Sequence, residues 1–188
     1  MTATRVFLAI AAGAAVLAVT PPVHAFLGSA AGGPHEVLIL RHAEEPKGAD
    51  PNLNAAGKAR AKGLAQWIPA TYGKPDVLFA NHATDKSRRA VDTLEPLAAA
   101  LHLKIQDQFK NEDFQKLAAR LLSDQQFAGK RILICWNKGN IAKLATALGV
   151  RKTPDWPDSQ YDHIWRLQFG AGGVTLDDAV QKLPAGGK

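Results

Sequence analysis

Short apolar runs alternate with longer segments of helical periodicity along most of the chain. Apolar runs predict strands at 37–40, 77–80, 103–105 and 131–135, and a terminal hairpin at 164–169 and 174–176. Apolar positions at helical spacing predict helices at 55–68, 87–101, 113–122 and 141–148. Strands that alternate with helices predict an α/β fold, a three-layer αβα sandwich with a mainly parallel central sheet.

Proline and capping residues set the expected helix boundaries. Pro69 is expected to end the first helix, and Pro96 to kink or break the second. Either Asn54 or Asp50 is expected to cap the first helix, because both side chains can accept a backbone hydrogen bond there.

Composition narrows the function classes. The 188 residues are enough for one domain with a sizeable core, and the net charge of +6 is spread along the chain without a run of five like charges. We therefore expect no nucleic-acid partner, and the basic balance fits a small anionic substrate or serves solubility. The one cysteine, Cys135, excludes an intramolecular disulfide and reads as a small core residue. No P-loop or dinucleotide fingerprint is present.

The N-terminus resembles a secretory signal. Arg5 precedes an uncharged apolar stretch at 6–19, and small residues end the segment at Ala25. We expect a signal peptide at 1–25, a flexible lead-in at 26–35 and one domain at 36–188. This predicts a periplasmic or secreted protein with no stable membrane span after cleavage. An uncleaved anchor is the alternative, although the stretch is short for a spanning helix.

Two polar clusters follow predicted strands. Arg41 and His42 come directly after the first apolar run, where open α/β sheets bind ligands. Arginine offers a fork of donors to phosphate, and histidine a nucleophile or base near neutral pH. The second cluster, residues 81–93, opens a helix whose N-terminus attracts anions. The first cluster alone is equally compatible with a strand that ends in polar surface residues, and the second alone is more typical of an exposed basic first turn of a helix.

Four segments together resemble the histidine phosphatase (phosphoglycerate mutase-like) superfamily. Arg41-His42-Ala43-Glu44 is similar to its Arg-His-Gly signature, with alanine for glycine. The segments at 53–61, 89–98 and 132–136 are similar to its first helix start, its arginine-bearing helix and the strand before its second histidine. The resemblance covers about residues 36–170 in matching order, and it implies a phosphoglycerate mutase-like fold.

The resemblance implies roles for particular residues. His42 would attack phosphorus and form a phosphohistidine, while Arg41 and Arg89 would hold the phosphoryl oxygens, with Arg88 as the alternative to Arg89. No cofactor or metal is expected, because the arginines supply the charge.

An acid must protonate the leaving oxygen in the same scheme. The resemblance implies Glu112 as the first candidate for this proton donor and Asp113 as the second. Both acids also fit a solvated helix start, where negative charge complements the helix dipole.

The chain departs from the superfamily after the strand at 131–135. The expected second histidine is replaced by Asn137, or by Lys138 in a register shifted by one residue. His82 and His163 are the possible substitutes, and His163 reads as a strand-edge residue. Asparagine donates a hydrogen bond to a phosphoryl oxygen without charge. We expect Arg41, His42, Arg89 and Asn137 to line one pocket.

These residues predict a phosphomonoester hydrolase that works through His42 on a phosphorylated small molecule or an envelope phosphoester. Turnover is expected to be impaired at Asn137. The alternative is a non-catalytic relative of the phosphatases that binds a phosphorylated ligand in the cell envelope.

Overall fold

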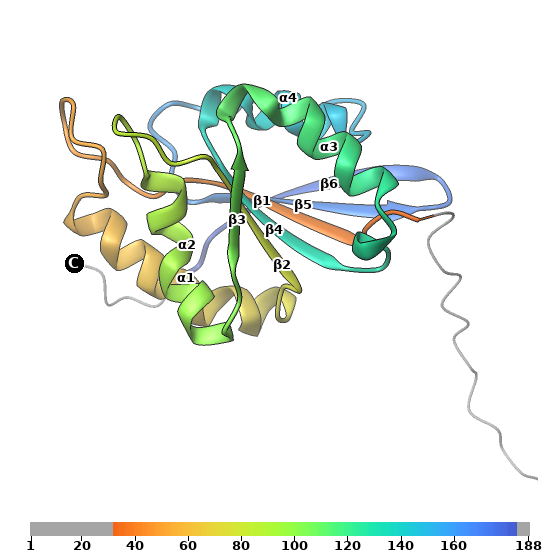
Figure 1. Cartoon of the computed structure of the whole chain (residues 1–188), viewed down its shortest axis with the longest axis horizontal. Helices are drawn as coiled ribbons and strands as arrows, with labels where there is room; N and C mark the ends of the chain where they lie inside the picture. The colour runs from red at the N-terminus through yellow and green to blue at the C-terminus, as the bar shows by residue number, and fades with distance from the viewer. Residues whose placement is uncertain (1–31, 184–188) are drawn as a thin grey trace, which may run out of the picture.

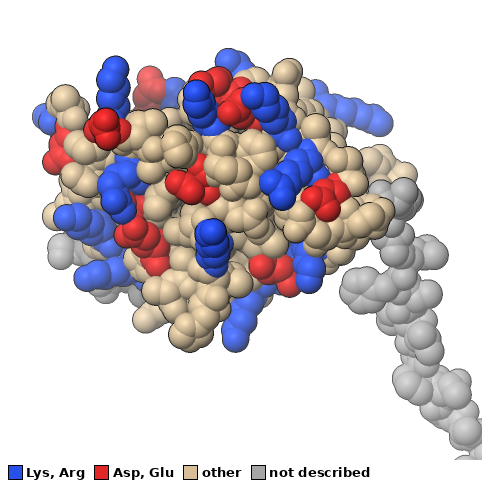
Figure 2. Space-filling view, viewed as in Figure 1, with Lys and Arg blue, Asp and Glu red and all other residues tan. Residues whose placement is uncertain are grey.

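The structure is a computed structural model that describes residues 32–183. The signal peptide expected at 1–25 lies outside the described residues, as does most of the lead-in expected at 26–35. None of the helices within residues 32–183 is long and apolar enough to cross a membrane. Basic and acidic side chains are interspersed over the face of the molecule in Figure 2.

One six-stranded sheet forms the centre of the molecule, in the order β3-β2-β4-β1-β5-β6. The strands are β1 (Glu36–Arg41), β2 (Val77–Asn81), β3 (Ile105–Phe109), β4 (Arg131–Trp136), β5 (His163–Gly170) and β6 (Gly173–Val180). The first four run parallel, and the β5–β6 hairpin adds to β1 in antiparallel direction. The prediction of a mainly parallel sheet is therefore confirmed.

Two pairs of helices cover the sheet, one pair on each face (Figure 1). The helices are α1 (Ala55–Tyr72), α2 (Arg89–Leu101), α3 (Phe114–Ser123) and α4 (Lys138–Ala147). Alternate residues of β1 supply the two cores: Val37 and Ile39 pack with α3 and α4, whereas Leu38 and Leu40 pack with α1 and α2. This arrangement confirms the three-layer αβα sandwich. Cys135 is fully buried in the second core, and burial raises the pKa of its thiol.

Both prolines lie inside helices, so the prediction that Pro69 ends the first helix is wrong, and the second helix is not broken at Pro96. The helix expected to end at Pro69 continues to Tyr72, where the Gly73 amide donates to the Pro69 carbonyl at 3.1 Å. Pro96 likewise lies within α2, whose buried face packs on the sheet. Tertiary packing outweighs the amide hydrogen bond that each proline removes.

Three boundaries shift for local reasons. Helix α2 begins at Arg89 rather than 87, because Ser87 is engaged in a backbone turn with Thr84. The third strand begins at Ile105 rather than 103, because His102 adopts a left-handed conformation that closes α2. Helix α4 begins at Lys138 rather than 141. Asn54, and not Asp50, caps α1 by accepting a hydrogen bond from the Gly57 amide.

Candidate active site

The candidate site lies at the carboxyl ends of the parallel strands. Arg41 is the last residue of β1 and pairs in register with Trp136, the last residue of β4. His42 and Asn137 therefore follow neighbouring strands at the same edge of the sheet. The His42 amide also donates to the Trp136 carbonyl at 3.3 Å, which extends the pairing by one residue.

His42 is a buried, neutral imidazole with a defined tautomer. Its side chain is held by a 2.8 Å contact between Nδ1 and the Ala43 carbonyl, and only Nδ1 can donate there. The Nδ1–H tautomer leaves the lone pair of Nε2 available as a nucleophile. Burial lowers the pKa of His42 below 6.5, and the charges of Arg41 and Arg89 lower it further, whereas Glu45 and the Ala43 hydrogen bond oppose the shift.

Arg41 is 6 % exposed and lies beneath the loop at 151–162. Its Nη1 donates to the Asp158 carbonyl at 2.5 Å and to the Gln160 carbonyl at 3.4 Å. The ring of Tyr161 stacks on the guanidinium group, 3.8 Å from its carbon to the ring centroid. The loop thus holds Arg41 through Nη1 and through the face of its guanidinium group. It does not contact Nη2, which faces Glu45.

Glu45 joins Arg41 to Arg89. The Glu45 carboxylate lies 3.3 Å from Nη2 of Arg41 and 3.0 Å from Nη2 of Arg89. It also accepts a hydrogen bond of 3.3 Å from the Tyr161 hydroxyl. Arg89 is anchored from its other side, because its Nη1 donates to the Asp50 carbonyl at 2.9 Å. The two arginines therefore converge on one anionic group close to His42.

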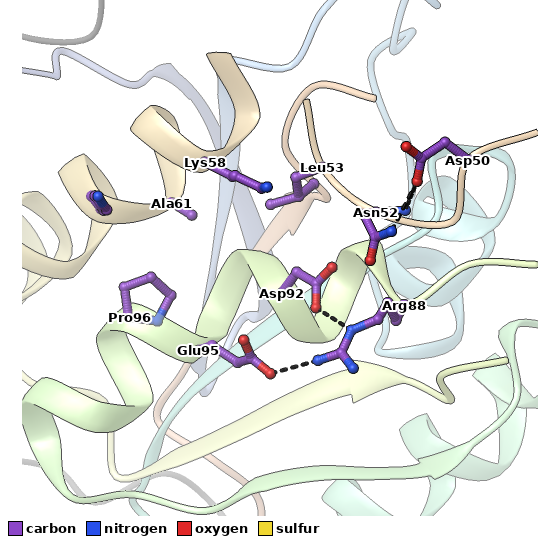
Figure 3. Close-up of a pocket in the computed structure, with 10 residues that line it drawn as sticks. Asp50, Asn52, Leu53, Lys58, Ala61, Arg88, Asp92, Glu95 and Pro96 are labelled. Atoms are coloured by element: carbon purple, nitrogen blue, oxygen red, sulfur yellow. Dashed lines mark hydrogen bonds and ion pairs between the residues drawn. The ribbon is translucent and has the colours of Figure 1, made fainter. Parts of the chain in front are cut away.

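Arg88 points away from this convergence. Its guanidinium group pairs with Asp92 and Glu95 on its own helix, beside a cavity of about 490 Å³ between α1 and α2 (Figure 3). Of the two arginines left open by the sequence, Arg89 is the one that shares a carboxylate with Arg41.

Thr93 and Gly57 hold the segment that carries these groups. Thr93 is fully buried, accepts a hydrogen bond from the Ala43 amide at 2.9 Å, and donates one to the Arg89 carbonyl at 2.7 Å. A Cβ atom on Gly57 would lie 2.3 Å from the Glu44 carbonyl oxygen, so only glycine permits this close approach. These contacts fix the turn after His42 against the starts of α1 and α2.

A second cavity, of about 330 Å³, lies beyond the ends of β2 and β4. Asn137 lines it together with Glu112, His82 and five other residues, namely Asn81, Thr84, Ser87, Lys110 and Asn111. Arg41, His42 and Arg89 do not line this cavity. The structure thus brings Asn137 and Glu112 together in one cavity that the other three predicted site residues do not line.

The 3-10 turn Asn111–Asp113 presents Glu112 to that cavity. The Asn111 carbonyl accepts hydrogen bonds from Trp136 Nε1 and Asn140 Nδ2, both at 3.1 Å, which ties the turn to β4 and α4. Asp113 is engaged differently: a hydrogen bond from Lys116, together with the Lys110 amide, lowers the pKa of its carboxyl group. Asp113 is therefore engaged by Lys110 and Lys116, whereas Glu112 lines the cavity together with Asn137.

Each side chain that could stand in for the missing histidine already has a partner. Lys138 forms an ion pair with Asp158, and His163 lies 2.7 Å from Asp178 on the neighbouring strand β6. His82 lines the same cavity as Asn137, although its Nδ1 is 2.8 Å from the Asp107 carbonyl. Within residues 32–183, no group of three or more histidine, cysteine, aspartate or glutamate side chains could hold a metal ion.

A scan of the sequence against protein families finds no match, and no curated protein matches it. Solved structures do match. The protein histidine phosphatase SixA, complexed with tungstate, superposes with a TM-score of 0.52 at 16% identity, covering 77% of this chain and 96% of that one. A phosphoserine phosphatase mutant from Entamoeba histolytica, in complex with phosphoserine, gives 0.54 at 15% identity, covering 78% and 96%.

A phosphoglycerate mutase from Bacillus anthracis gives a TM-score of 0.53 at 13% identity, covering 78% of this chain and 92% of that one. These similar structures are members of the histidine phosphatase superfamily. This protein has the histidine phosphatase fold. The phosphoglycerate mutase-like architecture expected from the sequence is therefore confirmed.

Within this histidine phosphatase fold, two contributors to the site were not anticipated from the sequence. Glu45 lies three residues after His42, and Tyr161 lies more than a hundred positions later along the chain. Nothing in the sequence marks Glu45 as a site residue, since it is only the second of two adjacent acids. Tyr161 lies in an irregular loop, where only tertiary structure brings it to Arg41.

Proposed function

We propose that this protein is a phosphomonoester hydrolase with His42 as its nucleophile. The observation that carries this proposal is the convergence of Arg41 and Arg89 on a single anionic group beside a neutral histidine whose Nε2 is free. Two guanidinium groups positioned in this way are suited to hold phosphoryl oxygens, because phosphoryl transfer depends mainly on positioning and charge stabilisation. The fold of known phosphatases supports the same interpretation.

The reaction has two steps. Nε2 of His42 attacks phosphorus, the bond from phosphorus to the leaving oxygen breaks, and the leaving oxygen takes a proton from Glu112. Water then gives a proton to the Glu112 carboxylate and attacks phosphorus, the bond from phosphorus to Nε2 breaks, and phosphate leaves, which returns both His42 and Glu112 to their starting forms. Because burial lowers the pKa of His42, the imidazole is unprotonated, and therefore nucleophilic, at neutral pH.

Asn137 is the residue expected to limit turnover in this site. It follows β4 next to His42, where its amide donates to a phosphoryl oxygen without the charge of an imidazolium. A second candidate function follows from this residue, namely a phospholigand-binding protein without turnover. Lys138→His is the register control for any variant at Asn137, because Lys138 points to Asp158.

A phosphate-release assay on an aryl phosphate distinguishes the two functions. The enzyme should release phosphate, form an acid-labile phosphoprotein and lose both properties in His42→Ala. A binding protein should show neither, while phosphate raises its melting temperature. Absence of turnover and of phosphate-dependent stabilisation would contradict both functions.

We further propose that residues 1–25 direct export, so that the protein acts on a phosphorylated small molecule or an envelope phosphoester in the periplasm or outside the cell. Their charge and apolar pattern supports this location. N-terminal sequencing of protein recovered from the periplasm or medium should begin near Phe26. An intact Met1 on protein from the cytoplasm would contradict export.

A further inference from the structure

Glu45 occupies the place between the two arginines to which the proposed function assigns the phosphoryl group. Both contacts of its carboxylate are made by an Nη2 atom, at 3.3 Å from Arg41 and 3.0 Å from Arg89. The remaining Nη1 atoms are already engaged by backbone carbonyls, those of Asp158 and Asp50. Glu45 therefore holds both Nη2 donors, whereas Nε of Arg41 and Nε of Arg89 are buried without a hydrogen-bond partner among the described residues.

The neighbouring acid, Glu44, has a different role. Arg60 donates three hydrogen bonds to the Glu44 carboxylate, at 2.7 to 3.0 Å. Burial by itself would raise the pKa of Glu44, but the hydrogen bonds and charge of Arg60 outweigh it and lower the pKa. Glu44 thus fastens its segment to α1, which leaves Glu45 as the carboxylate that faces the arginine pair.

Glu45 is also able to leave. Its side chain is 30 % exposed, and residues 42–54 form neither helix nor strand. A rotation of the side chain would transfer the carboxylate to water without breaking a regular element. The Tyr161 hydroxyl is the one neutral group that holds it, at 3.3 Å.

We propose that Glu45 is an internal competitor for the phosphate site, an autoinhibitory contact that substrate must displace and whose return expels the product phosphate. This inference rests on the proposed function, because it places the phosphoryl group between Arg41 and Arg89. Because Glu45 is tethered to the same chain, its carboxylate competes at an effective concentration in about the millimolar range. Free phosphate competes only at the concentration at which it is present in solution. Its charge also offsets one of the two guanidinium charges while the site is empty of substrate.

The expected size of the effect follows from the contacts. A charge-assisted hydrogen bond is worth about 1.5–3 kcal/mol, and the partial exposure of Glu45 favours the lower end. Removing the competing charge should therefore tighten phosphate binding by about tenfold. The Michaelis constant and the inhibition constant of phosphate should fall together, because substrate and product displace the same group.

The test compares Glu45→Gln with a matched control. Glu95→Gln removes an exposed carboxylate of α2 that accepts from Arg88 at 2.7 Å (Figure 3). Isothermal titration with inorganic phosphate at pH 8 should give a dissociation constant about tenfold lower for Glu45→Gln than for the parent. Glu95→Gln should match the parent.

Several outcomes would overturn the inference. These are unchanged or weaker phosphate binding by folded Glu45→Gln, an equal gain in Glu95→Gln, or no phosphate binding by either the parent or Glu45→Gln. If Glu45→Gln does not fold, Tyr161→Phe takes its place, because it removes the hydroxyl that donates to Glu45. Tyr161→Phe should bind phosphate more tightly than the parent, by less than Glu45→Gln would. Unchanged phosphate binding by Tyr161→Phe would contradict the role of Glu45 as a competitor.

The titration separates this inference from the proposed enzyme. If no variant hydrolyses an aryl phosphate but Glu45→Gln binds phosphate more tightly, the competitor stands and the enzyme proposal fails. If the parent hydrolyses the ester but Glu45→Gln binds no better, only the competitor fails.

Discussion

Two adjacent arginines offer a matched test of the site, because the structure directs them to different places. Arg89 contacts the carboxylate shared with Arg41, whereas Arg88 pairs with acids on the surface of α2. Nη1 of Arg89 donates to the Asp50 carbonyl, so Nη2, which faces Glu45, is the terminal nitrogen available to a phosphoryl oxygen that displaces Glu45. One charge-assisted hydrogen bond of about 1.5–3 kcal/mol corresponds to about 10- to 150-fold in rate. Arg89→Ala should therefore lower kcat/KM by about this factor.

Phosphate release from an aryl phosphate measures this loss, and Arg88→Ala is the control. The Arg88 side chain is 47 % exposed, and surface ion pairs of this kind contribute about 0–1 kcal/mol to stability. Arg88→Ala should keep kcat/KM within about threefold of the parent. Thermal unfolding of both variants shows whether any loss reflects unfolding. The assignment would be refuted if Arg88→Ala lost as much activity as Arg89→Ala, or if Arg89→Ala lost none.

Three further predictions concern the same edge of the sheet. Asn137→His should raise turnover by about 10²–10³, since an imidazolium would stabilise phosphoryl oxygens better than a neutral amide; a phosphate-release assay without any gain would count against this. The acid limb of the kcat/KM profile should lie below pH 6.5, because burial lowers the pKa of His42 and protonation removes the nucleophile; a limb above pH 6.5 would contradict it. Gly57→Ala should destabilise the fold by about 1–3 kcal/mol in denaturant unfolding, because its Cβ would meet the Glu44 carbonyl oxygen at 2.3 Å. Gly63→Ala, whose Cβ has ordinary contacts, should not destabilise it.

The fold could be predicted because hydrophobic periodicity determines which faces are buried. In β1, alternate side chains enter opposite cores, and the apolar run that predicted the strand is the same run that both helical layers cover. Local signals were less reliable at helix boundaries. Pro69 and Pro96 are helix breakers by propensity, yet each lies within a helix because the packed face continues past it.

The sequence predicted the position of a site residue only where a motif or the end of a strand determined that position. Arg41, His42 and Asn137 follow from the strand ends, because parallel strands deliver their last residues to one edge. The choice between Arg88 and Arg89 depends on helix phase, which the sequence does not fix at a first turn. Their roles in catalysis stay predictions until the variants are assayed.

Glu44 and Glu45 show where sequence reasoning ends. They are identical in chemistry and adjacent in the chain, yet Arg60 holds one and the Arg41–Arg89 pair holds the other. The difference arises from the close approach of this segment to α1, which directs successive side chains to opposite sides. Arg41 and Arg89, whose Nη2 atoms share the Glu45 carboxylate, line neither the cavity between α1 and α2 nor the cavity at Asn137. In this site the proposed anion-binding groups are therefore recognised by the carboxylate that they share rather than by a cavity that they line.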